Sequence, residues 1–273
     1  MIYLINSEYV NQQMKNLELR NDKLETINVR TNDMSYEVGE YVDVDIVSGK
    51  TIINNRVDKP LNFLDYFHKG KLSKEQLTEK MSDYVALIEN DKYRMILQEM
   101  IFSCDDFFVF PAAKSIHHAY IGGLCEHTLN MLDLSKGFLE LYDLNKDLLY
   151  TGIMLHDFGK VRELKEYGLS YTIEGNLLGH ISICNEEIAH IAMNLEINDE
   201  PEIYALKHLI LSHHGKLDYG SPKEPMLIEA YVLSMLDEMD AKLNLLEKEM
   251  AKVEKGKMSP PLMGFDRRRF IKL

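Results

Sequence analysis

The sequence predicts a mainly α-helical fold, in which a helical bundle carries a small β-rich module at its N-terminus. Short β-leaning runs broken by turn signals fill residues 1–59, and apolar residues at helical spacing dominate from Leu61 onward. The 273 residues, 45% of them hydrophobic, supply enough apolar side chains for a sizeable core. We therefore expect a β-rich module at 1–59, a helical domain at 60–254 and an extended tail at 255–273.

Composition excludes several classes of protein. With only 15 Gly and 7 Pro, the chain is neither collagen-like nor of low complexity. No uncharged apolar run approaches the roughly 18 residues of a membrane span, and the N-terminus lacks the basic and apolar regions of a secretory signal. Three widely spaced cysteines without a CxxC pair suit a reducing compartment. These features predict a cytoplasmic protein without a membrane partner.

The chain is acidic, with a formal net charge of −13. Such a surface repels nucleic acid at long range, so a phosphate-bearing ligand must be held by local cations. Those cations could be clustered Lys and Arg side chains or bound metal. Ten histidines, most of them in the second half of the chain, are candidate ligands for a metal.

Four β-leaning runs are expected in the module, which ends at Pro60. The run from Tyr41 alternates apolar and polar residues as a half-buried strand does, and Ser48-Gly49-Lys50 can close a hairpin after it. The four runs are Ile2–Ile5, Glu25–Arg30, Tyr41–Val47 and Thr51–Val57.

Helical periodicity follows the module. Ser73 and Gln76 form a capping-box pattern ahead of an apolar stripe that begins at Leu77, and a second apolar segment covers Met95–Ile101. The later helices are expected at roughly 119–142, 146–157, 177–194, 201–213 and 225–254. The tail, which contains Pro260-Pro261, is expected to be an extended strap.

Polar residues recur on the apolar stripes of five helices, and this pattern is the main functional signal. One such histidine is more often a satisfied core residue than a ligand, but five stripes that each deliver His or Asp favour a metal over a metal-free polar network. An unpaired buried carboxylate costs several kcal/mol, and a divalent cation would satisfy it. The polar stripe residues are His127, His156 with Asp157, His180, His213, and Asp237 with Asp240 and Asn244.

The dipeptide His156-Asp157 can direct both side chains to one site only near a helix end, because neighbouring residues differ by about 100° around a helix. Gly159 is expected to supply that end. One Asp can bridge two metals through its two oxygens, so four histidines and two aspartates suffice for a dinuclear centre. Such a centre activates water and clamps a phosphoryl group during in-line displacement.

These residues resemble the signature of the HD phosphohydrolase superfamily, with His127, His156-Asp157 and Asp237 in its H…HD…D order. The chain also resembles the YhaM family of bacterial metal-dependent 3′-5′ exoribonucleases over roughly 61–270. The strings that carry this resemblance include Gly123-Leu-Cys-Glu-His127 and His156-Asp-Phe-Gly-Lys-Val-Arg-Glu-Leu, and the others lie at 111–118, 174–182, 211–216 and 235–244.

The resemblance implies hydrolysis of single-stranded RNA, or of single-stranded DNA, from the 3′ end to 5′-mononucleotides. It also implies an N-terminal OB-fold that grips the strand. The 59 residues available are short for a five-stranded barrel, so we expect a partial OB-like module whose last strands follow Tyr36.

The resemblance and the stripes together assign two divalent metal ions. His127, His156, Asp157 and Asp237 would hold the first, and Asp157 would bridge to a second ion held by His180 and His213. Manganese is favoured by the resemblance, with Fe, Co, Ni, Zn and Mg left open.

Further roles are expected around the metals. Lys160 would stabilise charge on the phosphoryl oxygens, or else serve as a helix C-terminal lysine. His214 would contact the phosphate or donate a proton to the leaving oxygen, although His213 and His214 could be exchanged. Asp240 would orient a ligand or cap a neighbouring element. The predicted substrate contacts are His117, His118 and Arg162.

Two other functions remain open from the sequence. One is an HD hydrolase of small nucleotides, which the short module would permit. The other is a non-catalytic nucleic-acid-binding adaptor, against which the intact His127, His156, Asp157 and Asp237 argue. The expected partner is single-stranded RNA or a short oligonucleotide, and a homo-oligomer is left open.

Overall fold

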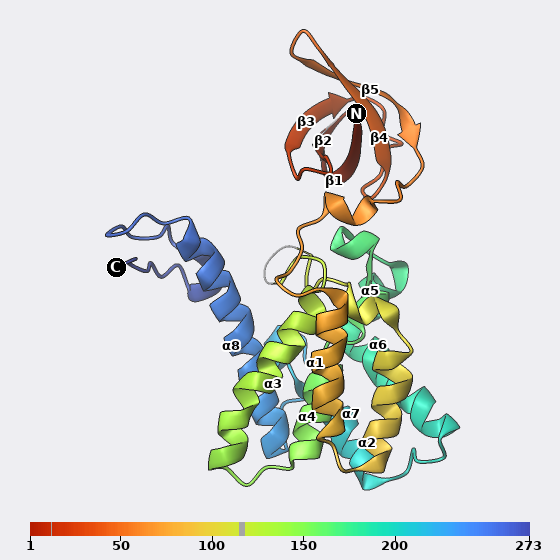
Figure 1. The fold of residues 1–273 in the computed structure, drawn as a ribbon, viewed down its shortest axis with the longest axis vertical. Coiled ribbons are helices and arrows are strands. Elements are labelled where there is room, and N and C mark those ends of the chain that lie inside the picture. Colours follow the sequence, from red (N-terminus) through yellow and green to blue (C-terminus); the bar gives the residue numbers. More distant parts are fainter. Residues whose placement is uncertain (12, 115–117) are drawn as a thin grey trace.

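The computed structural model describes residues 1–11, 13–114 and 118–273. A five-stranded sheet lies beyond one end of a helical bundle, and the last long helix, α8 (Ile228–Ala251), projects from the bundle toward the C-terminus (Figure 1). The expected fold class, a mainly helical bundle with an N-terminal β-rich module, is confirmed. His117, one of the predicted substrate contacts, lies outside the described residues.

The module is an antiparallel sheet with the strand order β3-β2-β1-β4-β5. The sequence indicated four of these five strands and missed β2, for which tight turns leave room. Leu17 and Leu19 of β2 are fully buried and alternate with polar residues. Whether the module is a partial OB-fold stays a prediction. The strands are β1 (Ile2–Asn11), β2 (Met14–Arg20), β3 (Thr26–Thr31), β4 (Tyr41–Val47) and β5 (Lys50–Val57).

The bundle begins after the short 3-10 turn η1 (Phe63–Tyr66). The capping box of Ser73 and Gln76 starts the first helix as predicted. A helix expected from residue 119 starts only at Gly123, because Gly122 takes a φ of +82. The α-helices that precede α8 are α1 (Lys74–Ala86), α2 (Asp91–Leu97), α3 (Gly123–Leu141), α4 (Lys146–Leu155), α5 (Lys160–Glu163), α6 (Ile173–Asn194) and α7 (Pro201–Ser212).

A strained loop connects α5 to α6 and contacts the module. It contains the two-residue strands β6 (Leu164–Lys165) and β7 (Ser170–Tyr171), joined through Glu166, Tyr167 and Gly168, which have φ values of 49, 52 and 87. The Tyr167 ring lies 5.2 Å from that of Phe63 and 5.5 Å from that of Phe67, measured between centroids. The loop therefore packs against the turn that leads out of the sheet.

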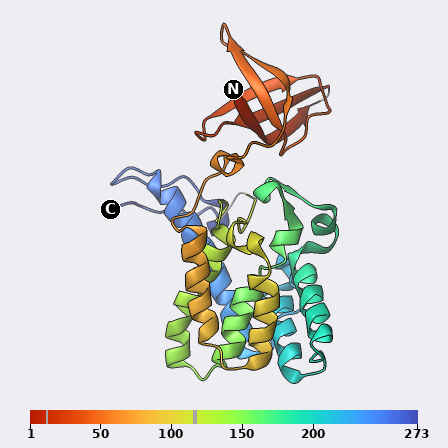
Figure 2. The same cartoon turned by 45° about the vertical axis from the view of Figure 1, so that its right-hand side comes forward.

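A small apolar cluster joins the sheet to the bundle. Leu4 and Tyr41 of the sheet pack with Tyr66, Phe67 and Leu169. The rings of Tyr41 and Tyr66 meet edge to face with centroids 5.3 Å apart. The turned view shows the chain crossing once between the two parts (Figure 2). The predicted division at residue 59 stays a prediction, although β5 ends at Val57 and the turn η1 that precedes the bundle starts at Phe63.

The tail differs from the expected strap because it doubles back on itself. Bridges between Met258 and Ile271 and between Leu262 and Arg268 pair its two halves. No helix within the described residues is long and apolar enough to cross a bilayer.

Candidate metal centre

Six predicted ligands converge inside the bundle although they come from five parts of the chain. His156 ends α4, and Asp157 lies in the turn that follows. Gly179 breaks α6 with φ 71 and ψ 155 immediately before His180. The other three ligands are His127 in α3, His213 at the end of α7 and Asp237 in α8.

Asp157 lies at the middle of the cluster and its two oxygens face different histidines. Oδ2 is 3.3 Å from Nε2 of His156 and 3.9 Å from Nε2 of His127. Oδ1 is 3.4 Å from Nε2 of His180 and 3.8 Å from Nε2 of His213. Asp237 faces the first pair, with Oδ1 3.3 Å from Nε2 of His127. One carboxylate thus separates two sets of imidazole nitrogens.

The outward nitrogen of each ring is held by an acceptor. Nδ1 of His156 donates to the carbonyl oxygen of Ile153 at 2.8 Å, and Nδ1 of His213 donates to that of Ile210 at 2.7 Å. Because a carbonyl only accepts, these two rings carry their proton on Nδ1 and offer a lone pair at Nε2. Hydrogen bonds of this kind orient metal-binding histidines in general.

The other two rings are held by carboxylates. Nδ1 of His127 lies 2.6 Å from Oδ2 of Asp240, and Nδ1 of His180 lies 3.1 Å from Oε1 of Glu163. Glu163 was missed by the sequence reasoning, because 17 residues separate it from His180 and no spacing rule connects them.

The inward nitrogens fit a metal. Nε2 of His156, His180 and His213 is buried and has no hydrogen-bond partner within the described ranges. A buried polar atom without a partner costs free energy, and three such atoms around one carboxylate form the donor set that divalent transition metals prefer. Two groups of candidate ligands meet here, His127 with His156 and Asp157, and His180 with His213 and His214. The clusters therefore indicate divalent metal binding.

The charges of the cluster suit this use. Burial alone would raise the pKa of Asp157, but Lys160 and then His156 hold that pKa well below its ordinary value, so the carboxylate is ionised. Burial, with His156 and His214 nearby, lowers the pKa of His213 and keeps its ring neutral. Burial also lowers the pKa of His127, but its bonds to Asp237 and Asp240 raise it to about 9. A metal at His127 must therefore displace a proton.

Two glycines let the backbone close around the ligands. A Cβ on Gly159 would lie 2.1 Å from the carbonyl oxygen of His180, and one on Gly175 would lie 2.2 Å from that of Glu163. The sequence predicted that Gly159 ends the helix that carries His156. Its φ of −57 is not the left-handed conformation typical of such an end, and the residue instead permits the close approach of α6.

The remaining predicted residues lie around the cluster or away from it. Nζ of Lys160 is 2.6 Å from Oδ2 of Asp157. Nδ1 of His214 donates to the carbonyl oxygen of Tyr219 at 2.8 Å, which leaves Nε2 as the ring atom available to a substrate, and the predicted proton transfer stays a prediction. Arg162 turns away and pairs with Glu174 and Glu187 on α6. The structure gives no support to the expected substrate role of Arg162.

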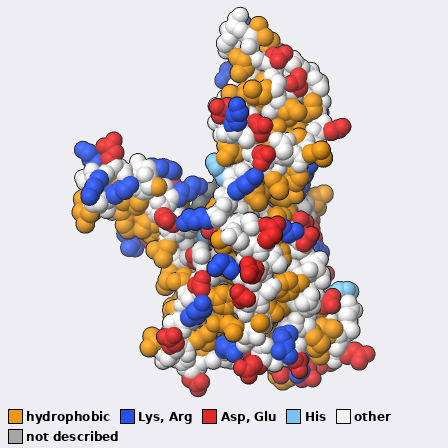
Figure 3. Space-filling view, in the orientation of Figure 1, with side chains coloured by type: hydrophobic (Ala, Val, Ile, Leu, Met, Phe, Trp, Pro, Cys, Tyr) orange, Lys and Arg blue, Asp and Glu red, His pale blue; other side chains and the backbone are white. Residues whose placement is uncertain are grey.

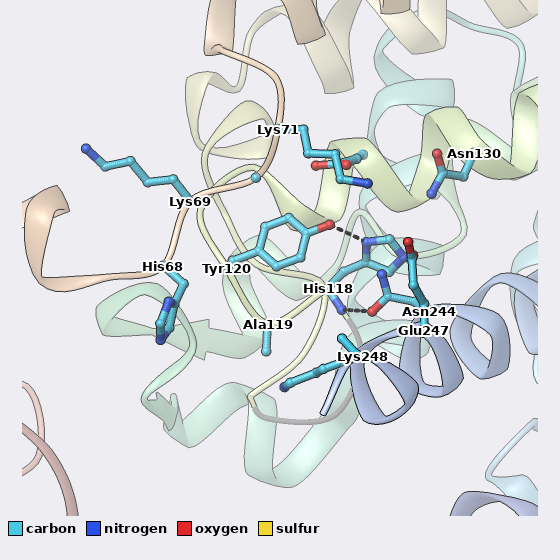
Figure 4. Close-up of a pocket in the computed structure, with 13 residues that line it drawn as sticks. His68, Lys69, Lys71, His118, Ala119, Tyr120, Asn130, Asn244, Glu247 and Lys248 are labelled. Carbon is cyan, nitrogen blue, oxygen red and sulfur yellow. Dashed lines mark hydrogen bonds between the residues drawn. The ribbon is translucent and has the colours of Figure 1, made fainter. Parts of the chain in front are cut away.

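His118 belongs to a buried network behind His127, where we had expected a substrate contact. Its side chain is only 1% exposed, with Nε2 2.7 Å from Oδ2 of Asp240. Nδ1 of His118 lies 2.8 Å from the hydroxyl of Tyr120 (Figure 4). Asn130 donates to the other oxygen of Asp240 at 3.1 Å. Asp240 thus joins His127 to His118, which agrees with its predicted role of orienting a ligand.

Replacing Asp240 by alanine is expected to weaken metal binding about 10–100-fold while the chain stays folded, because His127 loses the acceptor that orients its ring. Equilibrium dialysis or calorimetry with Mn²⁺ measures the affinity. Glu238→Ala, an exposed acid on the same helix, is the matched control. An Asp240→Ala affinity equal to that of the control would show that the network does not support the metal.

Comparisons with known proteins point to one family. The HD domain family matches residues 124–242. The 3′-5′ exoribonuclease YhaM of Listeria welshimeri is 40% identical over 213 residues, which cover 77% of this chain and 68% of that protein. The YhaM proteins of a Geobacillus species and of Shouchella clausii are 41% and 43% identical, over 76% of this chain and 65% and 66% of theirs. No solved structure matches the chain.

Proposed function

Because this chain belongs to the YhaM family of 3′-5′ exoribonucleases, which are HD-domain hydrolases, we propose that it removes 5′-mononucleotides from the 3′ end of single-stranded RNA. The matched part spans about two thirds of the length of its relatives, between 65% and 68%. The observation that carries the proposal is the position of Asp157, whose two oxygens face two separate sets of histidine nitrogens.

The residues present fit two divalent ions, and we propose manganese for both. His127, His156 and Asp237 would hold one ion, His180 and His213 the other, and Asp157 would contact both. Ions in these positions would polarise the phosphoryl oxygens and activate a water molecule at neutral pH.

The chain's own residues prepare the site for a phosphodiester. Lys160, whose side chain is 12% exposed, keeps Asp157 ionised and adds positive charge beside the reacting group. His213 is the proposed ligand of the doublet because its ring is fully buried and lies nearest Asp157. His214 is half-buried, and its ring lies 5.2 Å from that of His180, where it can contact the substrate.

Digestion of labelled RNA tests the proposal. With Mn²⁺, a 3′-labelled single strand should lose its label first as a mononucleotide, while a 5′-labelled strand should give a ladder that shortens stepwise. EDTA should stop both reactions and added Mn²⁺ should restore them, because the clustered ligands need a metal. A 5′ label released first, or free nucleotides hydrolysed in preference to RNA, would contradict the proposal.

A further inference from the structure

A basic cavity lies between the module and the bundle of this acidic chain. We call it the seam pocket, a cavity of about 190 Å³ lined by three cations, Arg20, Lys114 and Lys248, and by the imidazole of His68. No Asp or Glu is among the described residues that line it. Lys and Arg side chains also gather where the module, the bundle and the α8 arm meet (Figure 3). In a chain with a net charge of −13, this separation of charge marks a place for an anion.

The side chain of Arg20 is partly buried, and one of its nitrogen atoms has no hydrogen-bond partner among the described residues. Its Nε atom is buried and has no hydrogen-bond partner in the described part of the chain, and burial lowers the pKa of its guanidinium. Glu18, two residues away on β2, accepts a hydrogen bond from Asn6. The guanidinium lies over the Phe67 ring, with its carbon 5.4 Å from the centroid. A half-buried guanidinium next to an aromatic ring is a typical partner for a phosphate of a nucleic acid.

His68 lies close to the positive charges of Arg20 and Lys248. Burial lowers its pKa first, and Arg20 and Lys248 lower it further. His68 and Lys248 come from the linker and from α8, so elements far apart in the sequence place basic side chains at one cavity (Figure 4). An anion bound among them would relieve this repulsion.

The seam pocket adjoins a larger cavity of about 510 Å³ and shares His68, Tyr120 and Lys248 with it. That larger cavity is also lined by His118, which reaches the metal ligand His127 through Asp240. The two cavities together are lined by residues of the sheet and by His118 of the network behind the metal centre.

We propose that the seam pocket binds a phosphodiester of single-stranded RNA upstream of the 3′ end, with Arg20 and Lys248 as its main contacts. This inference rests on the proposed function for the identity of the strand. Binding at the seam would hold RNA to both parts of the protein at once. RNA would then be bound at the junction of the module and the bundle as well as on the exposed faces of the sheet.

Fluorescence anisotropy with a short labelled single-stranded RNA in EDTA tests the inference, because no hydrolysis occurs without metal. The double variant Arg20→Gln/Lys248→Gln should bind about tenfold more weakly than the wild-type chain. Its dependence of log affinity on log salt should flatten by about 0.7 for each lost phosphate contact. Lys23→Gln on the module and Lys242→Gln on α8 are exposed matched controls and should stay within about twofold of wild type.

The outcomes separate this inference from the proposed function. RNA affinity of the double variant equal to that of the controls, with melting temperatures unchanged, would overturn the seam site. Competition by AMP as strong as that by RNA at the same concentration would also overturn it, since the pocket would then be a mononucleotide site. If the wild-type chain gave no 3′-5′ ladder but the double variant still lost RNA affinity, the proposed function would fail and the seam site would stand.

Discussion

Replacing Asp157 by asparagine is expected to remove metal binding and to lower the rate of RNA hydrolysis by at least about 1000-fold. The carboxylate is the one described group that faces both sets of imidazoles, at 3.3 Å from His156 and 3.4 Å from His180. Loss of an outer partner of a ligand costs about 10–100-fold, so loss of the shared ligand should cost more. Elemental analysis of the purified variant and a digestion assay measure the two effects.

The fold of this variant needs its own control. Asp157 forms a buried ion pair with Lys160, and removal of one partner of such a pair costs about 3–5 kcal/mol. The double variant Asp157→Asn/Lys160→Met removes both charges and should recover part of that stability, as thermal unfolding would show, while remaining inactive. Wild-type metal content and activity in Asp157→Asn would refute the assignment of the centre.

Replacing Gly159 by alanine should destabilise the chain by about 3 kcal/mol, the upper part of the usual range for overpacking. The new Cβ would lie 2.1 Å from the carbonyl oxygen of His180, a backbone atom that cannot move without displacing α6. His180 would shift with it, so metal affinity should fall together with stability. Urea unfolding without metal and Mn²⁺ titration follow the two quantities.

Gly137→Ala is the matched control, since a Cβ there meets nothing within 4 Å on α3. It should raise the free energy of unfolding by up to about 1 kcal/mol, because alanine favours helix. If both alanine variants changed stability equally, the close approach of α6 to Gly159 would not be the cause.

The sequence predicted the helical part well because its signals are local. The capping box at Ser73 and the apolar stripes are properties of neighbouring residues, and a buried histidine on such a stripe can be read without a structure. The sequence places Leu177 on the same apolar stripe as His180, but the Leu177 side chain is 77% exposed. The kink at Gly179 separates it from the rest of α6.

The sequence did not predict contacts between distant segments. Strand β2 was missed because Leu17 and Leu19 are its only two fully buried apolar residues among charged neighbours. The partners of the imidazoles also escaped notice, since Glu163 and the carbonyl oxygen of Ile210 acquire their roles only after folding. The unpaired Nε atom of Arg20 depends on packing across the seam in the same way.

The loop between α5 and α6 connects the metal centre to the turn below the sheet. It starts immediately after Glu163, whose carboxylate contacts Nδ1 of His180. It also contains Tyr167, whose ring packs against those of Phe63 and Phe67 next to the sheet. The left-handed backbone at 166–168 lies between these two contacts, so lengthening the loop is expected to change the distance between the sheet and the metal centre.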